Sequence, residues 1–560
     1  MKLFRHISIL LLLFILSLVS KAQYFLNPIL SGFYPDPSIC RAGDDYYLVN
    51  SSFAYYPGLP IFHSKDLVNW KQIGSVLDRP SQLNLDGAGV SRGLFAPSIS
   101  YHKGKFYLVC TLIDKGGNFV VTTTDPKGPW SDPVWLPEAD GIDPSLFFDD
   151  DGKAYIIYNS IPPDNKPMHD GHRTIRINEF DALQLKITNG NRIIVNGGTD
   201  MAKKPVWIEA PHILKKDGWY YLICAEGGTG YNHSEVVFRT KNLNEPFIPY
   251  EKNPILTQRH LDHNRKDPIT TSGHADFVEG PDGKWWGVFL ACRPYEGDHY
   301  NTGRETFMAP VEWKDGWPGF NLGGDEIKYS YSINATPNQQ AEKYNGNFFF
   351  YDEFDSAALN NRYSFLRTVR EQWYTVNDGK LEMQLRPQTC SGKENPSFIG
   401  FRQHHLKGIA GTSISFTPKA ANEKAGLLVF QSEQHYYFLC IGTENGQTFV
   451  QLYKGRGKES NSKEPELVTS APVKIKNRRS ISLSIDAHGD TYSFHYTKKG
   501  KRRYLLKDSV DARFLSTKTA GGFVGCFYAL YATSNGQPSS SKAYFSWFAS
   551  KSEDEVYKQK

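Results

Sequence analysis

VWIEAPHILKKDGWYYLICAEGG, residues 206–228, contains the pattern on which the architecture of this 560-residue chain depends. Its first half carries one carboxylate, Glu209, among apolar neighbours. Its second half is the turn Asp217-Gly218 followed by an aromatic strand at residues 219–223. Two apolar strands joined by a tight Asp-Gly turn predict a β-hairpin. One hairpin says little about a fold, but this chain repeats it.

The hairpin recurs five times between residues 27 and 329. Its aromatic strand carries a matching residue every 48 to 66 positions, namely Tyr47, Tyr107, Tyr155, Tyr221 and Trp286. Another short apolar strand precedes each copy. Five repeats, each long enough for four strands, are typical of a five-bladed β-propeller. A β-sandwich would not repeat one hairpin five times, and a β-helix would have shorter periods.

The residues that open the first strand of each repeat should meet in space, because this strand lines the axis of a propeller. These residues are Asp36, Phe95 with Ala96, Asp143, Glu209 and His274. Three carboxylates, one aromatic ring and one imidazole from five distant segments would then share one pocket. The repeat therefore predicts a pocket rich in titratable groups.

The pattern changes near residue 331. Residues 331–347 contain the turn-forming stretches TPNQQ (336–340) and YNGN (344–347) and are expected to form a linker. Residues 348–560 contain alternating strands without the repeat, which favours a β-sandwich of the jelly-roll or concanavalin-like type. We therefore expect an all-β protein, with a five-bladed β-propeller over residues 23–330 followed by an accessory β-sandwich.

Residues 1–22 have the pattern of a secretory signal peptide. Lys2 and Arg5 precede an apolar run at residues 7–19, and small residues follow before Gln23. A single membrane anchor is the alternative, but the run is short for a membrane span. We expect an exported protein, periplasmic or secreted, without stable membrane insertion.

The net charge bears on the class of binding partner, and the cysteines bear on disulfide formation. Cleavage after residue 22 would lower the formal charge from +5 to +2, because that segment holds three Lys or Arg and no acid. A nearly neutral chain argues against nucleic acid as a partner.

Five of the seven cysteines lie in or after apolar strands and are expected to be buried thiols, although one or two disulfides would suit an exported protein. They are Cys110, Cys224, Cys292, Cys440 and Cys526.

Carboxylates in a small pocket suit proton transfer, as in hydrolysis of a glycosidic bond. This reaction needs a protonated acid for the leaving oxygen and a base to activate water. Glu209 has apolar neighbours, which raise a carboxyl pKa, so it is the expected acid. The prolines around Asp36 fix its backbone, which suits a base that positions one water. Asp143 could orient the acid and keep the pKa of that acid high by charge repulsion.

The alternative is that each carboxylate only caps a turn. A lone Asp-Pro is more often such a cap. Three acids at corresponding repeat positions instead favour a functional pocket. Residues 149–151, three consecutive Asp, are interpreted as an exposed turn, with cation binding as the less favoured alternative.

Motifs across residues 27–313 resemble those of glycoside hydrolase family 43, the five-bladed arabinofuranosidases and β-xylosidases. They occur in the family's order: YPDPSI (34–39), FHSKDLVNW (62–70), GIDPSLF (141–147), EAPHI (209–213), AEGGT (225–229), SGHAD (272–276) and GRETF (303–307). The C-terminal part resembles the sandwich appended to a β-xylosidase-like subgroup, in SFI (397–399) and RQ (402–403).

The resemblance implies roles for individual residues. Asp36 would be the general base, Asp143 the pKa modulator and Glu209 the general acid of an inverting enzyme. The acid and base carboxyls of such enzymes lie about 6.5–9.5 Å apart. Arg304 would contact the substrate hydroxyls or the base. Phe53 would form the apolar wall of the first sugar site, with a plain core residue as the alternative.

His274 would lie beneath the pocket, where some family members hold a cation or a water. A hydrogen-bonded core histidine is the equally weighted alternative. The chemistry requires no cofactor, and no metal ligands are assigned, although a structural calcium ion is compatible with the family.

The substrate follows from one departure. Several β-xylosidases carry Trp where this chain has Phe95, which offers less stacking surface. The insertion at residues 173–176 also argues against xylosidase specificity. We therefore expect release of terminal non-reducing α-L-arabinofuranose from hemicellulose polysaccharides or oligosaccharides. The alternatives are a β-1,4-xylosidase, a bifunctional enzyme, or a carbohydrate-binding protein without turnover. Fructose-transferring enzymes of the related fold fit less well, because Asn-Asp-Pro-Asn and Glu-Cys motifs are missing.

Two further points are left for the structure. The segment 173–176, Arg-Thr-Ile-Arg, lies in an insertion that the repeat does not place. The sandwich is expected to lend one side chain to the rim of the pocket. The oligomeric state cannot be inferred from the sequence.

Overall fold

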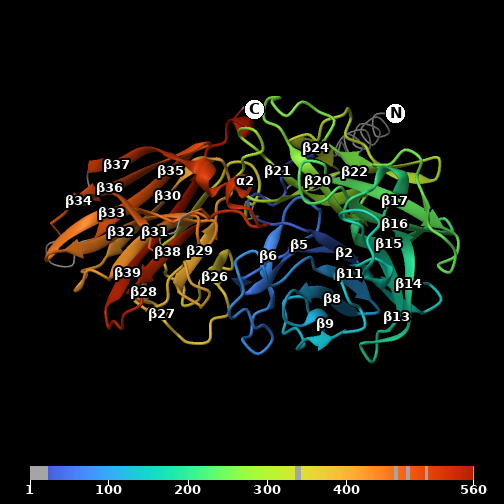
Figure 1. Cartoon of the computed structure of the whole chain (residues 1–560), viewed down its shortest axis with the longest axis horizontal. Coiled ribbons are helices and arrows are strands. Elements are labelled where there is room, and N and C mark those ends of the chain that lie inside the picture. The colour runs from blue at the N-terminus through green and yellow to red at the C-terminus, as the bar shows by residue number, and fades with distance from the viewer. Residues whose placement is uncertain (1–22, 334–341, 460–463, 475–479, 499–501, 559–560) are drawn as a thin grey trace, which may run out of the picture.

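A computed structural model describes residues 23–333, 342–459, 464–474, 480–498 and 502–558 of the chain. The expected signal peptide lies outside these residues. Figure 1 shows two units side by side, a propeller coloured blue to green and a sandwich coloured yellow to red. The predicted fold class, a five-bladed β-propeller followed by a concanavalin-like sandwich, is confirmed.

Five antiparallel sheets form the blades of the propeller. The first two contain β2 (Ser38–Ala42), β3 (Asp45–Val49), β5 (Gly58–Ser64) and β6 (Lys71–Leu77), then β7 (Ser98–His102), β8 (Lys105–Leu112), β9 (Gly117–Thr123) and β10 (Val134–Trp135). The third contains β11 (Ile142–Phe148), β12 (Ala154–Ser160), β13 (Thr174–Asp181) and β14 (Lys186–Asn196).

The fourth blade contains β15 (Glu209–Lys216), β16 (Trp219–Glu226), β17 (Ser234–Thr240) and β18 (Ile248–Pro249), with β19 (Leu256–Thr257) also on β17. The fifth contains β20 (Thr270–Glu279), β21 (Trp285–Cys292), β22 (Glu305–Lys314) and β23 (Trp317–Phe320). Strand β1 (Gln23–Leu26) pairs with β24 (Ser330–Ile333), so the two ends of this unit meet.

The hairpin predicted in residues 206–228 is formed by β15 and β16. Lys216 is paired with Trp219, and the two residues between them form the turn. Asp217 and Gly218 both have positive φ, 50° and 74°. This is the geometry of a type I′ turn, whose twist matches that of the strands and which Asp-Gly adopts readily.

The strands that enter the channel are distorted where the functional side chains lie. The pairing of β11, β15 and β20 with the following strand shifts register near the channel end. Residues at these shifts have a positive φ, among them Asp143 (53°), Ala210 (50°) and His274 (56°). Asp36, just before β2, also has a φ of 52°. Bulges re-aim side chains, so these distortions turn the opening residues into the channel.

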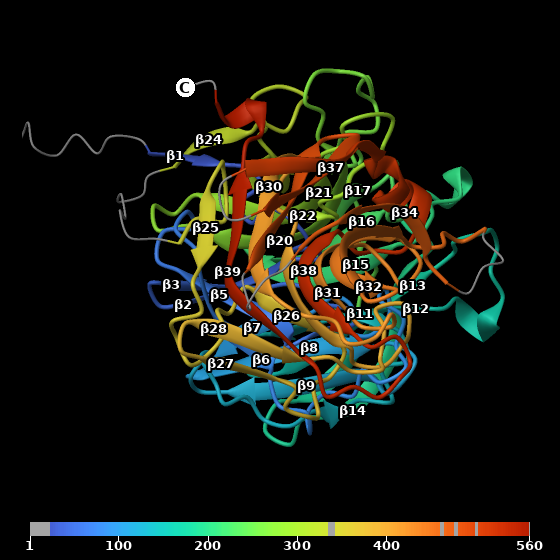
Figure 2. The same cartoon turned by 90° about the vertical axis from the view of Figure 1, so that its left-hand side faces the viewer.

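Two curved sheets form the sandwich, which faces the viewer in Figure 2. One contains β27 (Tyr374–Asn377), β28 (Lys380–Gln384), β39 (Lys542–Ser552), β30 (Lys407–Ser415), β35 (Ile481–His488), β36 (Thr491–Lys498) and β37 (Arg502–Asp511), with β25 (Phe349–Asp352) on β39. The other contains β34 (Glu466–Pro472), β33 (Gln447–Lys454), β32 (Tyr436–Glu444), β31 (Lys424–Phe430), β38 (Phe527–Thr533), β29 (Ser397–Arg402), β26 (Tyr363–Leu366) and β4 (Tyr55–Tyr56).

Helical structure is confined to short turns in the described residues. They are η2 (Pro163–Asn165), η3 (Met201–Lys203), η4 (Ala512–Leu515), α2 (Thr517–Ala520) and η5 (Glu555–Tyr557). None of them is long and apolar enough to cross a membrane.

The two units share a sheet and a core. Strand β4 lies in the sequence of the propeller, but it pairs with β26 of the sandwich, Tyr56 opposite Phe365 and Tyr55 opposite Leu366. One apolar cluster includes Leu59 of β5 and side chains from both sandwich sheets. Burial of apolar surface across this boundary holds the sandwich in a fixed position against the propeller.

A buried ionic network adds to this boundary. Arg293, at the end of β21, donates to both carboxylate oxygens of Glu305 at 2.7 and 2.8 Å. A third nitrogen of the same guanidinium donates to Asp554, near the C-terminus, at 2.8 Å. All three side chains are buried. The network therefore pairs the propeller with the chain end that follows β39.

The cysteines follow the sequence prediction. The five strand cysteines are buried free thiols, and Cys40 and Cys390 are free as well. The allowed disulfides are not formed.

Candidate active site

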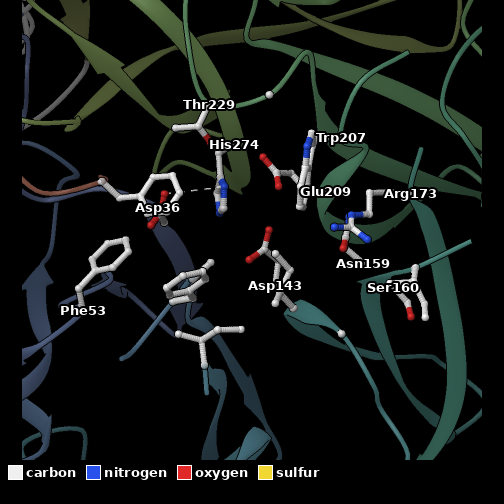
Figure 3. A pocket seen from close by; sticks show the side chains of 18 of the residues that line it. Asp36, Phe53, Asp143, Asn159, Ser160, Arg173, Trp207, Glu209, Thr229 and His274 are labelled. Carbon is white, nitrogen blue, oxygen red and sulfur yellow. Dashed lines mark ion pairs between the residues drawn. The ribbon is translucent and has the colours of Figure 1, made fainter. Parts of the chain in front are cut away.

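A cavity of about 550 Å³ opens at the end of the propeller channel. Every predicted site residue lines it, namely Asp36, Phe53, Phe95, Asp143, Glu209, His274 and Arg304. Figure 3 shows Asp36, Asp143 and Glu209 directed into the same space, with His274 between Asp36 and Glu209. The structure thus brings together residues that are up to 268 positions apart in the chain.

Asp36 is the most firmly held of the three carboxylates. Arg304 donates to its two oxygens at 2.6 and 3.3 Å, and the Ser51 hydroxyl donates at 2.6 Å. Two-pronged binding of a carboxylate by a guanidinium fixes both position and orientation. Asp36 is therefore held rigidly at the edge of the cavity.

Glu209 lies in a different environment. It opens β15, only 8% of its surface is exposed, and Trp207 stands beside it in the cavity wall. Burial raises the pKa of Glu209 well above its usual range, and the charges of Asp143 and Asp36 raise it further. Arg304 and Arg173 oppose this shift. A carboxyl with such a pKa keeps its proton near neutral pH and can donate it.

Asp143 links the other two carboxylates. Its Oδ2 accepts a hydrogen bond of 3.2 Å from the backbone amide of Ala210, the residue after Glu209. Burial raises the pKa of Asp143, and the charge of Asp36 adds to the effect. Asp143 thus holds the backbone beside Glu209 and contributes negative charge to its surroundings.

His274 lies at the base of this group. Its Nδ1 is 3.9 Å from Asp36 Oδ1. Burial lowers the pKa of His274 to about 3, even though Asp36 opposes the shift. The imidazole is therefore neutral at physiological pH and lines the cavity as a polar but uncharged wall.

The structure also bears on possible metal-binding sites. Among the described residues, no group of three His, Cys, Asp or Glu side chains is arranged to hold a metal ion. In the acidic turn at residues 149–151, Lys215 Nζ lies 2.6 Å from Asp149 and 3.0 Å from Asp150. The positive charge next to these two carboxylates therefore comes from Lys215, whereas the less favoured alternative from the sequence was a bound cation.

Three phenylalanines form an apolar wall opposite Glu209. The ring of Phe53 lies 5.3 Å from Phe95 and 5.9 Å from Phe523, centroid to centroid. The Arg304 guanidinium lies 5.6 Å from the Phe523 ring. Phe523 precedes β38, so the expectation that the sandwich lends a side chain to the pocket is confirmed. Phe53 is also a member of the buried core, so both interpretations of this residue apply.

Several lining residues were not assigned to the site from the sequence. Arg173, Trp207, Asn159, Ser160 and Thr229 all line the cavity, and Figure 3 shows most of them on the side of Glu209 away from Asp36. They come from the ends of strands and from loops that do not repeat. Three of them carried a signal in the sequence. Trp207 lies two residues before Glu209, Arg173 begins the segment 173–176, and Thr229 ends the motif AEGGT (225–229).

The comparison with sequence families agrees with this geometry. The family described as "Glycosyl hydrolases family 43" matches residues 25–318. The protein is a member of glycosyl hydrolase family 43. A second family, described as "Beta xylosidase C-terminal Concanavalin A-like domain", matches residues 351–551.

Relatives in family 43 match nearly the whole chain. A xylosidase/arabinosidase of Butyrivibrio fibrisolvens is 39% identical, covering 93% of this chain and 98% of its own. A non-reducing end α-L-arabinofuranosidase of Bacteroides ovatus is 36% identical, covering 95% of both chains. A GH43_12 crystal structure from a capybara gut metagenome is 43% identical, with a TM-score of 0.82 over 92% of this chain and 95% of its own.

Proposed function

We propose that this family 43 enzyme is an exo-acting, inverting glycosidase that releases terminal non-reducing α-L-arabinofuranose from hemicellulose. One observation carries the proposal. A buried Glu209 with a raised pKa shares a cavity with Asp36, which Arg304 binds through both oxygens. Environments that separate the protonation of two carboxyls identify an acid and a base.

The reaction is a single displacement. Asp36 accepts a proton from a water molecule, and the oxygen of that water attacks the anomeric carbon. Glu209 donates its proton to the glycosidic oxygen as the bond from that oxygen to the anomeric carbon breaks. The products are a free pentose of inverted configuration and an alcohol. Solvent returns the proton to Glu209 and removes it from Asp36.

Asp143 and Arg304 support this pair without exchanging protons with substrate. Asp143 fixes the backbone beside Glu209 and keeps the pKa of the acid high. Arg304 orients Asp36. The Nε atom of Arg304 is buried, and no described residue accepts a hydrogen bond from it. His274, neutral and buried, offers ring nitrogens to the substrate or to a water at the base of the cavity.

The shape of the cavity supports an exo mode on a pentose. Its volume of about 550 Å³ lies within the range of small-ligand pockets. Phe53, Phe95 and Phe523 close one side, so a chain cannot continue through it there. We favour arabinofuranose because Phe95 forms part of this wall and because one relative is named for that activity. The alternative is β-xylosidase activity, which other relatives' names carry.

A direct comparison of two substrates tests the proposal. Initial rates on aryl α-L-arabinofuranoside and aryl β-D-xyloside should give the higher kcat/KM for the arabinofuranoside. NMR of the first product should show the anomer opposite to that of the substrate. A higher value for the xyloside would select the alternative. Turnover of neither substrate would favour a carbohydrate-binding protein, and retention would contradict the single displacement.

We also propose that the protein is exported, to the periplasm or beyond. The support is the sequence pattern of residues 1–22, and the substrate proposed above is extracellular. N-terminal sequencing of the protein from its native cells should find Gln23 as the first residue. A mature chain that begins at Met1 would contradict export by this signal.

A further inference from the structure

The cavity carries different side chains on its two sides. In Figure 3, Asp36 and Phe53 lie on one side of Glu209, and Arg173 and Ser160 lie on the other. In a single displacement, the attacking water and the leaving group occupy opposite faces of the reacting carbon. If Asp36 activates the water, the leaving group extends toward Arg173.

The Arg173 guanidinium has hydrogen-bond donors without acceptors. It lies 4.0 Å from the centre of the Trp207 ring. Its Nε is buried, and among the described residues none accepts a hydrogen bond from it. Burial lowers the pKa of Arg173, and the Glu209 carboxyl opposes this shift only when it is ionised. Stacking on Trp207 holds the group flat but uses none of its N–H donors.

Backbone contacts keep this pair in place. Trp207 has a φ of 53°, and its amide donates to the carbonyl of Gly171 at 2.8 Å. The carbonyl of Arg173 accepts from Gly197 at 2.9 Å. A Cβ on Gly171 would lie 2.7 Å from the Val206 side chain, so only glycine allows this approach. The insertion that holds Arg173 is thus fixed against the segment before Glu209.

We propose that Arg173 and Trp207 form the subsite for the leaving group, where Arg173 donates hydrogen bonds to hydroxyl or ring oxygens of a neutral sugar. This assignment rests on the proposed function, because it takes Asp36 as the base and Glu209 as the acid. The same side carries Ser160, whose hydroxyl donates to the backbone of Asp140 at 2.6 Å. The carboxylate of Asp140 is exposed in the cavity wall and repels an acidic sugar, which selects a neutral one.

A substitution that keeps side-chain packing against Trp207 but removes the N–H donors tests the subsite. Arg173→Met retains an unbranched side chain over Trp207. Its kcat/KM is compared on an aryl α-L-arabinofuranoside and on an arabinose-substituted xylo-oligosaccharide, whose leaving group is a sugar. We expect the loss on the oligosaccharide to exceed the loss on the aryl substrate about tenfold. Equal losses on the two substrates, or no loss on either, would overturn the proposal.

Arg176→Met is the matched control. Arg176 lies three residues further along, on β13, and donates to Asn191 at 2.8 Å and to the backbone of Ile161 at 3.1 Å. It does not line the cavity. The ratio of the two kcat/KM values should equal that of the unchanged protein. An equal change of this ratio in both variants would also overturn the subsite.

A binding measurement separates the subsite from the reaction. Xylotriose, a leaving-group sugar without arabinose, is titrated calorimetrically into Glu209→Gln and into Glu209→Gln with Arg173→Met. The second protein should bind it about tenfold more weakly. Equal affinity, or no binding by either protein, would overturn the subsite. If the unchanged protein cleaves neither aryl pentoside, the proposed function fails, and this titration still decides the subsite.

Discussion

Asp143 accepts a 3.2 Å hydrogen bond from the backbone amide of Ala210, the residue that follows Glu209. Asp143 belongs to β11 and Ala210 to β15, so the bond joins two neighbouring blades. Both residues have positive φ at a register shift in their strands. A backbone conformation that costs energy at two matched places is typical of a functional site. The same carboxylate holds the backbone beside Glu209 and raises the pKa of Glu209.

The first prediction concerns the pH dependence of Asp143→Asn. The asparagine oxygen can still accept from Ala210, but the negative charge is gone. That charge raises the pKa of Glu209, so its removal lowers this pKa. Loss of the acidic proton then begins at lower pH, and the alkaline limb of kcat/KM against pH should move to lower pH.

Asp149→Asn serves as the control for this shift. Asp149 is paired with Lys215 in a hairpin turn and does not line the cavity. Its pH profile should coincide with that of the unchanged protein. An alkaline limb that stays in place or moves up in Asp143→Asn would contradict a modulating role for this carboxylate.

The second prediction uses the leaving group to identify the acid. Glu209→Gln removes the donated proton but keeps the size of the side chain. Proton donation matters most for poor leaving groups, so kcat/KM should fall about 100- to 10,000-fold on an oligosaccharide. The fall should be much smaller on an aryl glycoside with an acidic phenol. In Asp36→Asn, kcat/KM should instead fall by a similar factor on both substrates. If both variants showed the same dependence on the leaving group, the assignment of acid and base would be refuted.

The third prediction concerns the contribution of the sandwich to catalysis. Phe523 packs on Phe53 and Phe95 and lies only partly buried in the cavity wall. Phe523→Ala removes that wall, so kcat/KM on an aryl arabinofuranoside should fall about tenfold, as expected for loss of an aromatic contact of about 1.4 kcal/mol. The melting temperature should change little.

Phe514→Ala is the comparison for this variant. Phe514 is also partly buried in the sandwich, against His435 and Lys454, and does not line the cavity. Its kcat/KM should stay within twofold of the unchanged protein. Unaltered kinetics in Phe523→Ala would show that the sandwich takes no part in the pocket.

The sequence predicted the propeller and the convergence of its acids because both depend on a repeat. Each copy places one residue at the channel end, and Asp36, Asp143 and Glu209 occupy corresponding positions in their copies. The local signals of turn and strand agree with the global fold, as in Asp217-Gly218. When local turn and strand preferences agree with the global fold in this way, the fold can be predicted from the sequence.

The rest of the pocket depends on contacts that carry no local pattern. Phe523 reaches the cavity from the second unit, and Arg173 reaches it from an insertion. The pairing of β4 with β26 joins residues about 310 positions apart and could not be inferred from propensity. The positive φ at His274 could not be predicted either, because a left-handed backbone is uncommon for any residue other than glycine.

The last prediction concerns the ionic network at the boundary of the two units. Asp554 is buried and accepts from Arg293 at 2.8 Å and from the backbone amide of Lys407 at 2.8 Å. Burial alone would raise the pKa of Asp554, but His405 and Arg293 together hold it well below its usual range. Asp554→Asn leaves the buried guanidinium with one carboxylate, which should cost about 3 kcal/mol of unfolding free energy at neutral pH.

The stabilisation by Asp554 should depend on pH. A carboxyl with a lowered pKa in the folded state contributes stability above its ordinary pKa and loses it as the pH falls. The difference in unfolding free energy between the unchanged protein and Asp554→Asn should therefore shrink below about pH 4. Denaturant unfolding at pH 7 and at low pH measures it. Glu553→Gln, which loses only a surface ion pair with Lys551, should change stability by less than about 1 kcal/mol at either pH. A difference for Asp554→Asn that grew on acidification would mean that the carboxylate does not stabilise the boundary in its ionised form.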